Sequence, residues 1–229
     1  MSKKNEISRR KFLIGGASVL GGAALICAGG TALVRPRAEI SFHDSSCGHA
    51  SSADGKVLIA YASEAGSTSE IAAAMGQVMC QAGAVVDVRP VQAVSDLTPY
   101  RAVVVGSAIH SSAWLPEAAA FVATHRETLR EVPVAYFLSC LTLAVADTDK
   151  TRRQVAAYLD PVRQQIPEIQ PIDTGLFAGV LDFSKLPYPN VYRLVWPFTA
   201  GGEATEGDYR DWQAIRAWAG GLSRTMLDA

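Results

Sequence analysis

Short, continuous apolar runs recur through most of this chain, and they constrain its fold more than any other feature. The clearest are VLIAY at 57–61, AVVVG at 102–106 and PVAYFL at 133–138. Runs of this length without polar alternation are typical of strands that are buried on both faces, as in a parallel sheet covered by helices. Weaker strand patterns lie at 85–88 and 169–176. The sequence therefore predicts five buried strands.

Helical patterns separate these strands. Apolar residues at helical spacing follow the first, third and fourth strands, and the set after the fourth strand lies at 147–166. A final set lies at 209–226. Strands that alternate with helices over short loops indicate one α/β domain at 56–229, with a doubly wound, five-stranded parallel sheet. In such a sheet, ligands bind at the carboxyl ends of the strands, near the topological switch point.

The loop after the first strand carries the most informative motif, SEAGST at 63–68. Free N–H groups and hydroxyls at the start of a helix can hold a phosphate. Ser67 and Glu70 also fit a capping box, which would satisfy the helix end without a ligand. The chain lacks the Gly-Lys-Ser/Thr of nucleoside triphosphatases and the Gly-x-Gly-x-x-Gly of dinucleotide sites. It also lacks the acidic residues of a phospho-receiver after the first and third strands.

This loop resembles the Ser/Thr-x-x-Gly-x-Thr loop with which flavodoxins hold the phosphate of FMN. Over residues 56–222 the chain resembles, more narrowly, the menaquinone-dependent protoporphyrinogen oxidase family of flavodoxin-like proteins. The other motifs behind this resemblance are VVGSAI at 104–109, GGE at 201–203 and YRDW at 209–212. The resemblance implies a flavodoxin-like fold with FMN as cofactor. A single phosphate loop without a second nucleotide fingerprint predicts neither FAD nor a metal.

The resemblance also implies which segments form the flavin site. The residues assigned to the phosphate loop are Ser63, Glu64, Ala65, Gly66, Ser67 and Thr68. The residues assigned to the two sides of the isoalloxazine ring are Ser107, Ala108, Ile109, His110 and Trp114 on one side, and Ser139, Cys140, Leu141 and Thr142 on the other. Main-chain groups of these segments would tune the flavin.

Two side chains in these segments have competing interpretations. Trp114 either stacks on the flavin ring or packs on the sheet at the start of a helix. His110 is the candidate catalytic residue, as a proton donor near flavin N5, and the alternative is an exposed loop histidine. Flavodoxins often carry an aromatic residue in the loop after the fourth strand, but this chain has Ser139-Cys140-Leu141-Thr142 there.

Residues 1–37 form a basic leader before an acidic body. The leader holds seven basic residues and one acidic residue, which leaves residues 38–229 with a net charge of −7. Such a body disfavours nucleic acid as a partner. The motif SRRKFL lies at 8–13, and its last two residues open an uncharged run of 23 residues at 12–34. Together they resemble a twin-arginine export signal. An ordinary signal or N-terminal anchor is the alternative.

The leader predicts recognition by the twin-arginine translocase and export across the cytoplasmic membrane. About 20 apolar residues span a bilayer, and no clean cleavage site follows the run, so either a cut signal or a retained membrane anchor fits. Relatives that oxidise porphyrinogens face the cytoplasm, which sets this chain apart from them.

Residues 38–55 have the small, polar composition of a linker. His43, Cys47 and His49 lie close together there, but no fourth ligand is evident, and a metal site is not expected. Cys47, Cys80 and Cys140 are an odd number of thiols for an oxidising compartment, so at least one is unpaired or paired between chains.

The segment 177–198 is rich in aromatic residues and prolines. Either its rings pack against Trp212 and Trp218 of the last helix, or they form an apolar surface for a quinone or the bilayer. The prolines are expected to prevent regular structure at 188–198.

Three functions remain open at this point. The first, which the resemblance implies, is an FMN-dependent oxidoreductase that passes electrons from a reduced substrate to a quinone. Alternatively, it is a non-enzymatic, flavodoxin-type electron carrier between proteins, or a flavin-free interaction module. The electron donor and the oligomeric state are not indicated by any motif.

Overall fold

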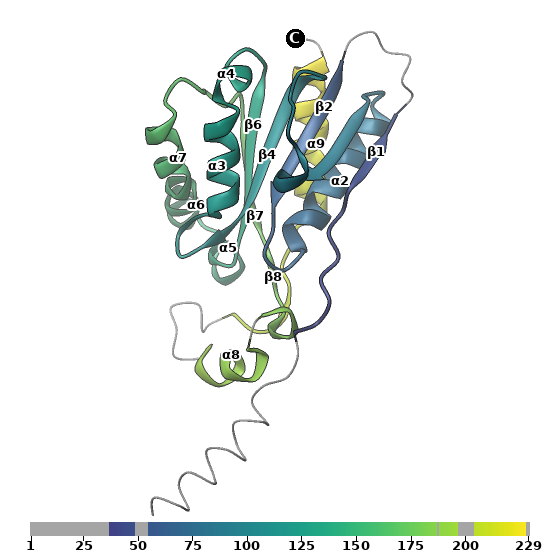
Figure 1. Ribbon diagram of the computed structural model, residues 1–229. Helices are drawn as coiled ribbons and strands as arrows, with labels where there is room; N and C mark the ends of the chain where they lie inside the picture. The colour runs from purple at the N-terminus through teal and green to yellow at the C-terminus, as the bar shows by residue number, and fades with distance from the viewer. Residues whose placement is uncertain (1–36, 49–54, 187, 197–203, 228–229) are drawn as a thin grey trace, which may run out of the picture.

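The computed structural model describes residues 37–48, 55–186, 188–196 and 204–227 (Figure 1). Five parallel strands form the centre of its main sheet. In spatial order they are β3 (Val86–Pro90), β2 (Lys56–Ala62), β4 (Tyr100–His110), β6 (Val134–Cys140) and β7 (Thr174–Ala178). Numbered along the chain as the five predicted strands, this order is 2-1-3-4-5, which is the doubly wound flavodoxin-like arrangement. The predicted fold class is confirmed.

Two short antiparallel strands extend this sheet. The strand β1 (Ser45–Cys47) pairs with β3 at one edge, and β5 (Ala113–Trp114) folds back on the end of β4. The linker prediction is wrong for residues 45–47. A three-residue edge strand needs no apolar pattern, because one of its sides stays open to solvent. A separate two-stranded ribbon joins β8 (Val180–Leu181) to β9 (Gly207–Asp208).

Helices cover both faces of the sheet (Figure 1). One face carries α2 (Ser67–Gln81) and α9 (Trp212–Leu227), which pack against each other. The other face carries α3 (Pro116–Thr124), α4 (Arg126–Leu129), α6 (Asp149–Ala156) and α7 (Asp160–Gln165), while α5 (Thr142–Val145) follows β6 directly. The short 3-10 turns are η1 (Val91–Ala93), η2 (Ala157–Leu159) and η3 (Phe183–Lys185).

The single helix predicted at 147–166 is three pieces: α6, η2 and α7. Pro161 lies in the first turn of α7, where its missing N–H interrupts a regular helix. The inward-facing residues of this region and of the last helix are nevertheless buried as predicted. They are Val155, Leu159, Val162, Ile166, Ile215, Ala219, Leu222 and Met226.

Phe137 fills the centre of the core and is fully buried. Its ring lies over the backbone of Gly106 in the neighbouring strand, and a Cβ at position 106 would lie 2.0 Å from the ring. The packing at this point therefore requires glycine, because no side chain has room beside the ring.

The aromatic segment contains a helix, α8 (Pro189–Val195), so the expectation that its prolines prevent regular structure is wrong there. Pro189 is the first residue of the helix, where a missing N–H costs nothing. Trp196 packs edge-on against Phe183, with ring centroids 5.6 Å apart, and its Nε1 donates to the carbonyl of Ala204 at 2.7 Å. Its packing partner is therefore Phe183, whereas Phe177 at the start of the segment packs edge-on against Trp218 of α9 as predicted, with ring centroids 5.7 Å apart.

Asp87 is a buried carboxylate on β3, only 3% exposed. Tyr100 donates to its Oδ2 at 2.9 Å, and the Lys56 ammonium lies 3.4 Å from the same oxygen. Burial alone would raise the pKa of this carboxyl. Hydrogen bonds from Ser46 and Tyr100 and the charge of Lys56 outweigh burial, so the pKa of Asp87 lies below its usual value.

Candidate functional site

The first turn of α2 lies at the carboxyl end of β2, at the switch point of the sheet. Gly66 occupies the N-cap position with φ +88°, a left-handed conformation, and it offers no side-chain acceptor to the helix. The capping-box prediction is wrong, because the Glu70 carboxylate instead accepts from Arg210 at 2.7 Å. Intrahelical bonding leaves the N–H groups of residues 67–69 without acceptors, so this helix end can receive an anion.

The hydroxyls of the predicted phosphate loop face different ways. Ser63 Oγ accepts from the N–H of Gly66 at 3.0 Å, which closes the turn before the helix. Thr68 is fully buried, and its Oγ1 lies 2.8 Å from Ser139 Oγ at the end of β6. Ser67 is half-buried at the first helical position. Its side chain is therefore the hydroxyl of this loop best placed to contact a ligand at the helix end.

A strap formed by residues 37–47 runs beside this loop. The Arg37 guanidinium donates to the carbonyl of Glu64 at 2.5 Å, and the N–H of His43 donates to Ser69 Oγ at 2.7 Å. Ile40 lies against Gly66, because a Cβ at position 66 would meet its Cγ2 at 3.2 Å. The strap thus supports the turn from the outside.

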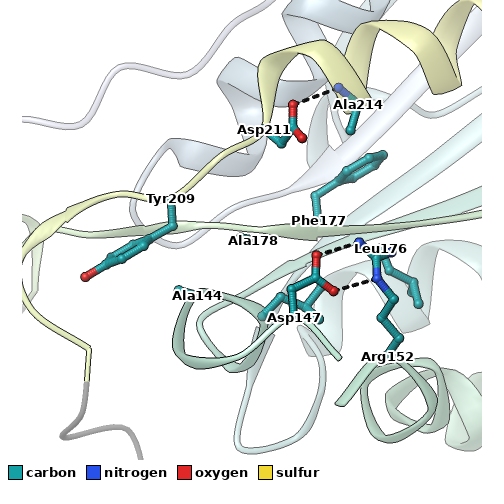
Figure 2. Close-up of a pocket in the computed structure, with 10 residues that line it drawn as sticks. Ala144, Asp147, Arg152, Leu176, Phe177, Ala178, Tyr209, Asp211 and Ala214 are labelled. Atoms are coloured by element: carbon teal, nitrogen blue, oxygen red, sulfur yellow. Dashed lines mark hydrogen bonds and ion pairs between the residues drawn. The ribbon is translucent and has the colours of Figure 1, made fainter. Parts of the chain in front are cut away.

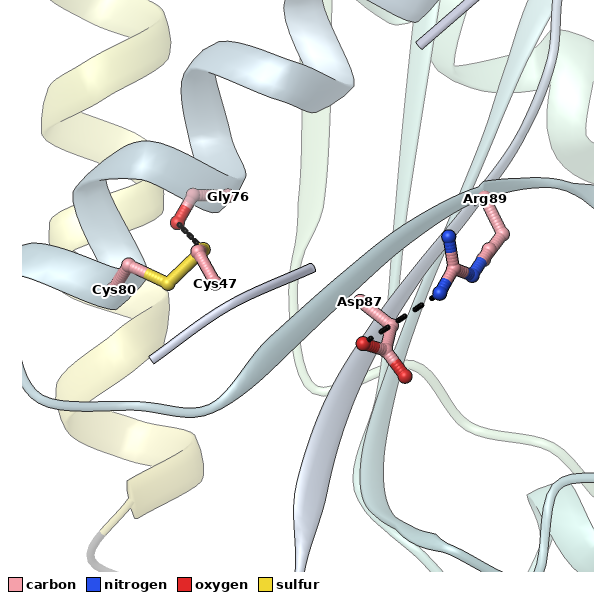
Figure 3. The surroundings of a disulfide bond; sticks show 5 residues. All are labelled: Cys47, Gly76, Cys80, Asp87 and Arg89. Carbon is pink, nitrogen blue, oxygen red and sulfur yellow. Dashed lines mark hydrogen bonds and ion pairs between the residues drawn. A yellow bond between two sulfur atoms is a disulfide. The ribbon is translucent and has the colours of Figure 1, made fainter. Parts of the chain in front are cut away.

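A disulfide between Cys47 and Cys80 anchors the end of the strap to α2 (Figure 3). Figure 3 also shows Asp87 and Arg89 on the neighbouring strand β3. This bond resolves the cysteine question within the described residues: Cys47 and Cys80 are paired, and Cys140 is free and buried. The Cys47 sulfur is consequently not available to the considered metal site, and His49 lies outside the described residues.

The segment predicted to line one side of the flavin is a hairpin of β4 and β5. Residue Ile109 pairs with Trp114, and His110 pairs with Ala113. The two tip residues, Ser111 and Ser112, have φ values of 51° and 63°. A two-residue turn with both residues left-handed matches the right-handed twist of paired strands, but it normally uses Asn or Gly. Strained backbone of this kind concentrates at functional sites.

Trp114 is buried in the core beneath this hairpin. It is 5% exposed, and its ring meets Tyr136 edge-on at a centroid distance of 5.1 Å. This placement favours the packing interpretation over stacking on a flavin. Its Nε1 donor is buried without a hydrogen-bond partner in the part of the chain that the structure describes. An unpaired buried donor is rare in a native fold and suits a site that binds a polar ligand.

His110 lies at the exposed end of β4, and its Nδ1 is 3.0 Å from Glu64 Oε2. The pair connects the hairpin to the loop that precedes α2. An open hollow of about 510 Å³ borders both residues. Its lining is Glu64, His110, Ser111, Ala113, Trp114, Leu115, Pro116 and Glu117. The histidine is therefore at a cavity edge, where a proton can reach it from solvent.

A second hollow, of about 460 Å³, lies between the hairpin and the loop after β6. Ile109, Ser111 and Ser112 line it from the hairpin, and Cys140, Leu141 and Thr142 line it from the loop. Burial raises the pKa of the Cys140 thiol, so this residue stays neutral. The structure thus brings together the two segments predicted to face each other across the flavin.

Ser107 and Ala108 lie within β4, between these features. Ser107 Oγ accepts from the N–H of Leu115 at 2.9 Å and donates to the carbonyl of Ala108 at 2.7 Å. The serine therefore fixes the base of the hairpin rather than facing a hollow. Ala65, in the turn before α2, is half-buried.

Arg210 is a residue of this region to which no role was assigned from the sequence. Its side chain is only 7% exposed, and it pairs with Glu70 and Asp208, each at 2.7 Å. Burial alone would lower its pKa, but these carboxylates outweigh burial and raise it. The YRDW motif marks the position without revealing the role, because the partners Glu70 and Asp208 become neighbours only in the fold.

A third cavity, of about 250 Å³, lies between the end of β7 and the start of α9 (Figure 2). The carboxylate of Asp147 and the guanidinium of Arg152 meet on one side of it through two hydrogen bonds of 2.6 Å. Tyr209 and Phe177 lie on the opposite side (Figure 2). It is separate from the two hollows beside the hairpin.

Within the described ranges, no group of three metal-binding side chains is found. No helix in those ranges is long and apolar enough to cross a membrane. The 23-residue uncharged run at 12–34 and the twin arginines lie outside the described residues.

Several solved structures resemble this chain. Flavodoxin 2 from Bacillus cereus is 17% identical over 74% of this chain and 99% of its own, with a TM-score of 0.47. The rubredoxin oxygen:oxidoreductase of Desulfovibrio gigas is 18% identical over 76% of this chain, with a TM-score of 0.43. This chain spans 36% of the length of that protein.

A flavoprotein from Lactobacillus acidophilus, solved in complex with FMN, is 14% identical over 53% of this chain and 93% of its own, with a TM-score of 0.38. No curated protein matches the sequence. The family model for the flavodoxin domain matches residues 58–190, which is more than half of the chain. This protein therefore belongs to the flavodoxin domain family.

Proposed function

We propose that this protein binds FMN at the carboxyl end of its sheet and transfers electrons through it. The observation that carries the proposal is the start of α2, where a glycine N-cap without a side-chain acceptor precedes the N–H groups of residues 67–69, which intrahelical bonding does not use. The phosphate of FMN would bind there, with Ser67 beside it. The partial positive charge of a helix N-terminus favours an anion at this position.

The hollows on either side of the β4–β5 hairpin would receive the isoalloxazine ring. The polar tip residues, and the Trp114 Nε1 that has no partner among the described residues, would supply hydrogen-bond donors to the polar edge of such a ring. FMN, when bound, supplies the redox chemistry, and the chain's own residues bind and orient it. His110, at the open edge beside Glu64, would hold the proton that accompanies electron transfer.

For the electron acceptor we propose a membrane quinone, as in the menaquinone-dependent protoporphyrinogen oxidase family. We also propose that the twin-arginine leader exports the domain and keeps it at the membrane. The Cys47–Cys80 disulfide supports an oxidising compartment, because cytoplasmic thiols are kept reduced. The alternative, a carrier between proteins, differs in its acceptor: the reduced flavin would be reoxidised faster by a protein than by a quinone analogue.

A charge at the helix end tests FMN binding. Ser67→Asp places a carboxylate where the phosphate would bind, while it favours the helix itself. We expect loss of FMN affinity of at least about tenfold from like-charge repulsion, with unchanged or higher stability. Ser67→Asn, similar in size but neutral, is the control and should keep the flavin. Full flavin absorbance in purified Ser67→Asp would contradict the assignment of the phosphate.

The export proposal has its own test. Changing Arg9 and Arg10 to lysine keeps the charge but removes the guanidinium pair. We expect the folded protein to remain in the cytoplasm, with Cys47 and Cys80 reduced and open to alkylation. Export equal to that of the parent protein would exclude the twin-arginine route.

A further inference from the structure

Exposed apolar side chains gather on α8. Seven large apolar residues are exposed among the described residues, and four of them lie at positions 188–195. They are Tyr188 at 57%, Val191 at 39%, Leu194 at 65% and Val195 at 41% exposure. Residues 191, 194 and 195 are spaced for one helix face. Such clustering marks an interaction surface rather than scattered surface variation.

Other side chains of this segment attach it to the rest of the domain. Arg193 pairs with Glu206 at 3.0 Å, and Phe183 and Trp196 pack together where the segment meets β8. Within the described residues, these contacts therefore leave the outer face of α8 exposed.

The chain enters the described structure beside this helix. The N–H of Ala38 donates to the carbonyl of Ser184 at 2.8 Å, and Arg37 Nε donates to the carbonyl of Lys185 at 2.5 Å. The uncharged run ends at Val34, three residues before Arg37. Three extended residues reach about 10 Å. A membrane anchor formed by residues 12–34 would thus leave the bilayer within about 10 Å of the turn that leads into α8.

We propose that the apolar face of α8 inserts into the lipid surface, as an in-plane contact that adds to the anchor. This inference depends on the membrane location proposed above. Val191, Leu194 and Val195 would enter the acyl boundary, and Tyr188 suits the headgroup level with its apolar ring and polar tip. Arg37 and Lys185 meet at the entry point, and their positive charges would attract anionic headgroups.

The contact also orients the candidate site. Arg37 bonds both Lys185 before α8 and Glu64 before α2, so a single side chain connects the lipid-facing segment to the phosphate loop. Figure 1 shows α8 beyond the same end of the sheet from which α2 and α5 begin. A lipid-bound α8 would therefore turn the carboxyl ends of the strands toward the bilayer, where a quinone is dissolved.

The test uses the full chain with Cys27→Ala, reconstituted into vesicles of phosphatidylethanolamine and phosphatidylglycerol. An environment-sensitive fluorophore is attached at Leu194→Cys. The control is Ile172→Cys, because Ile172 is also an exposed apolar residue, at 44%, and its N–H donates to the first residue of β6 at the opposite end of the sheet. Lipids with nitroxide-labelled headgroups serve as quenchers, and flavin absorbance is recorded on the same samples.

We expect loss of most fluorescence at position 194 and none at 172. Membrane-bound, flavin-containing protein with no quenching at either position would overturn the α8 contact and leave the proposed function intact. A label at 194 that is shielded from aqueous iodide but not quenched by lipid would assign the face to protein instead, either residues 12–34 or a second copy. A chain that does not stay with the vesicles would overturn the anchor and the α8 contact together, whatever its flavin content.

Discussion

Reduction of the Cys47–Cys80 disulfide should destabilise the domain substantially. The bond closes a loop with a sequence separation of 33 residues, from the edge strand β1 to the last turn of α2. In the chain-entropy model, a cross-link over such a loop restricts the unfolded chain by about 12.5 cal/mol/K. At 25 °C this corresponds to about 3.7 kcal/mol of stability. Loss on this scale is a large share of the net stability of a typical domain.

Urea unfolding with and without reductant measures the effect. For a denaturant slope of about 2–3 kcal/mol per molar, the midpoint should fall by about 1–2 M on reduction. The double variant Cys47→Ala/Cys80→Ala should unfold at the reduced midpoint and should not respond to reductant. Cys140 is free in the parent protein and in the double variant, so it does not contribute to the difference between their midpoints.

A loss below about 1 kcal/mol would refute this reasoning, since it would mean that the cross-link restricts the unfolded chain far less than its loop length implies. In that case the strap would be held by its hydrogen bonds to the domain, such as that of His43 to Ser69, and reduction would leave the loop before α2 unchanged.

Three further predictions concern the turn, the core and pH. Gly66→Ala should cost about 1–2 kcal/mol, because φ is +88° and the new Cβ would press on Ile40, and it should also weaken FMN retention. Gly83→Ala, with φ +95° and open space around it, should show the conformational cost alone in the same unfolding and flavin-release assays. Ile215→Ala should lower the free energy of unfolding by about 2–5 kcal/mol, because the side chain is fully buried between α9 and the sheet. The lowered pKa of Asp87 contributes stability that is present above its unfolded pKa, near 3.9, and is lost as pH falls through the folded value. Melting temperature against pH should therefore be flatter below pH 4 in Asp87→Asn than in the parent, and equal slopes would contradict the role given to this carboxylate.

The sheet was predictable because its signal is local. The strands β2, β4 and β6 each contain an unbroken apolar run, and helical patterns follow the first, third and fourth predicted strands, so the fold class follows from the rule for doubly wound folds. The edge strand β1 carries no such signal, because SSC at 45–47 is small and mostly polar. The break at Pro161 could have been placed from the sequence, since proline interrupts a helix regardless of its tertiary context.

The candidate site was predictable as segments but not as contacts. The three segments assigned by resemblance do meet, through Thr68 with Ser139 and Glu64 with His110. Which hydroxyl faces inward depends on strand register and helix rotation, and a motif does not encode either. The burial of Trp114 against Tyr136 follows from the antiparallel hairpin at 109–114, whose two left-handed serines have no sequence signature.

The strap also defines how the domain bears mechanical force. A pull on the chain ahead of Arg37 would load the bonds to Ser184, Lys185 and Glu64 together, so no single hydrogen bond carries it alone. If those bonds yield, the force passes along residues 38–46 and reaches the covalent link from Cys47 to Cys80. Peeling would take Ser45 and Ser46 off β3 and would stop at that link. A domain suspended from one end of its chain would thereby keep its five parallel strands paired under lateral drag.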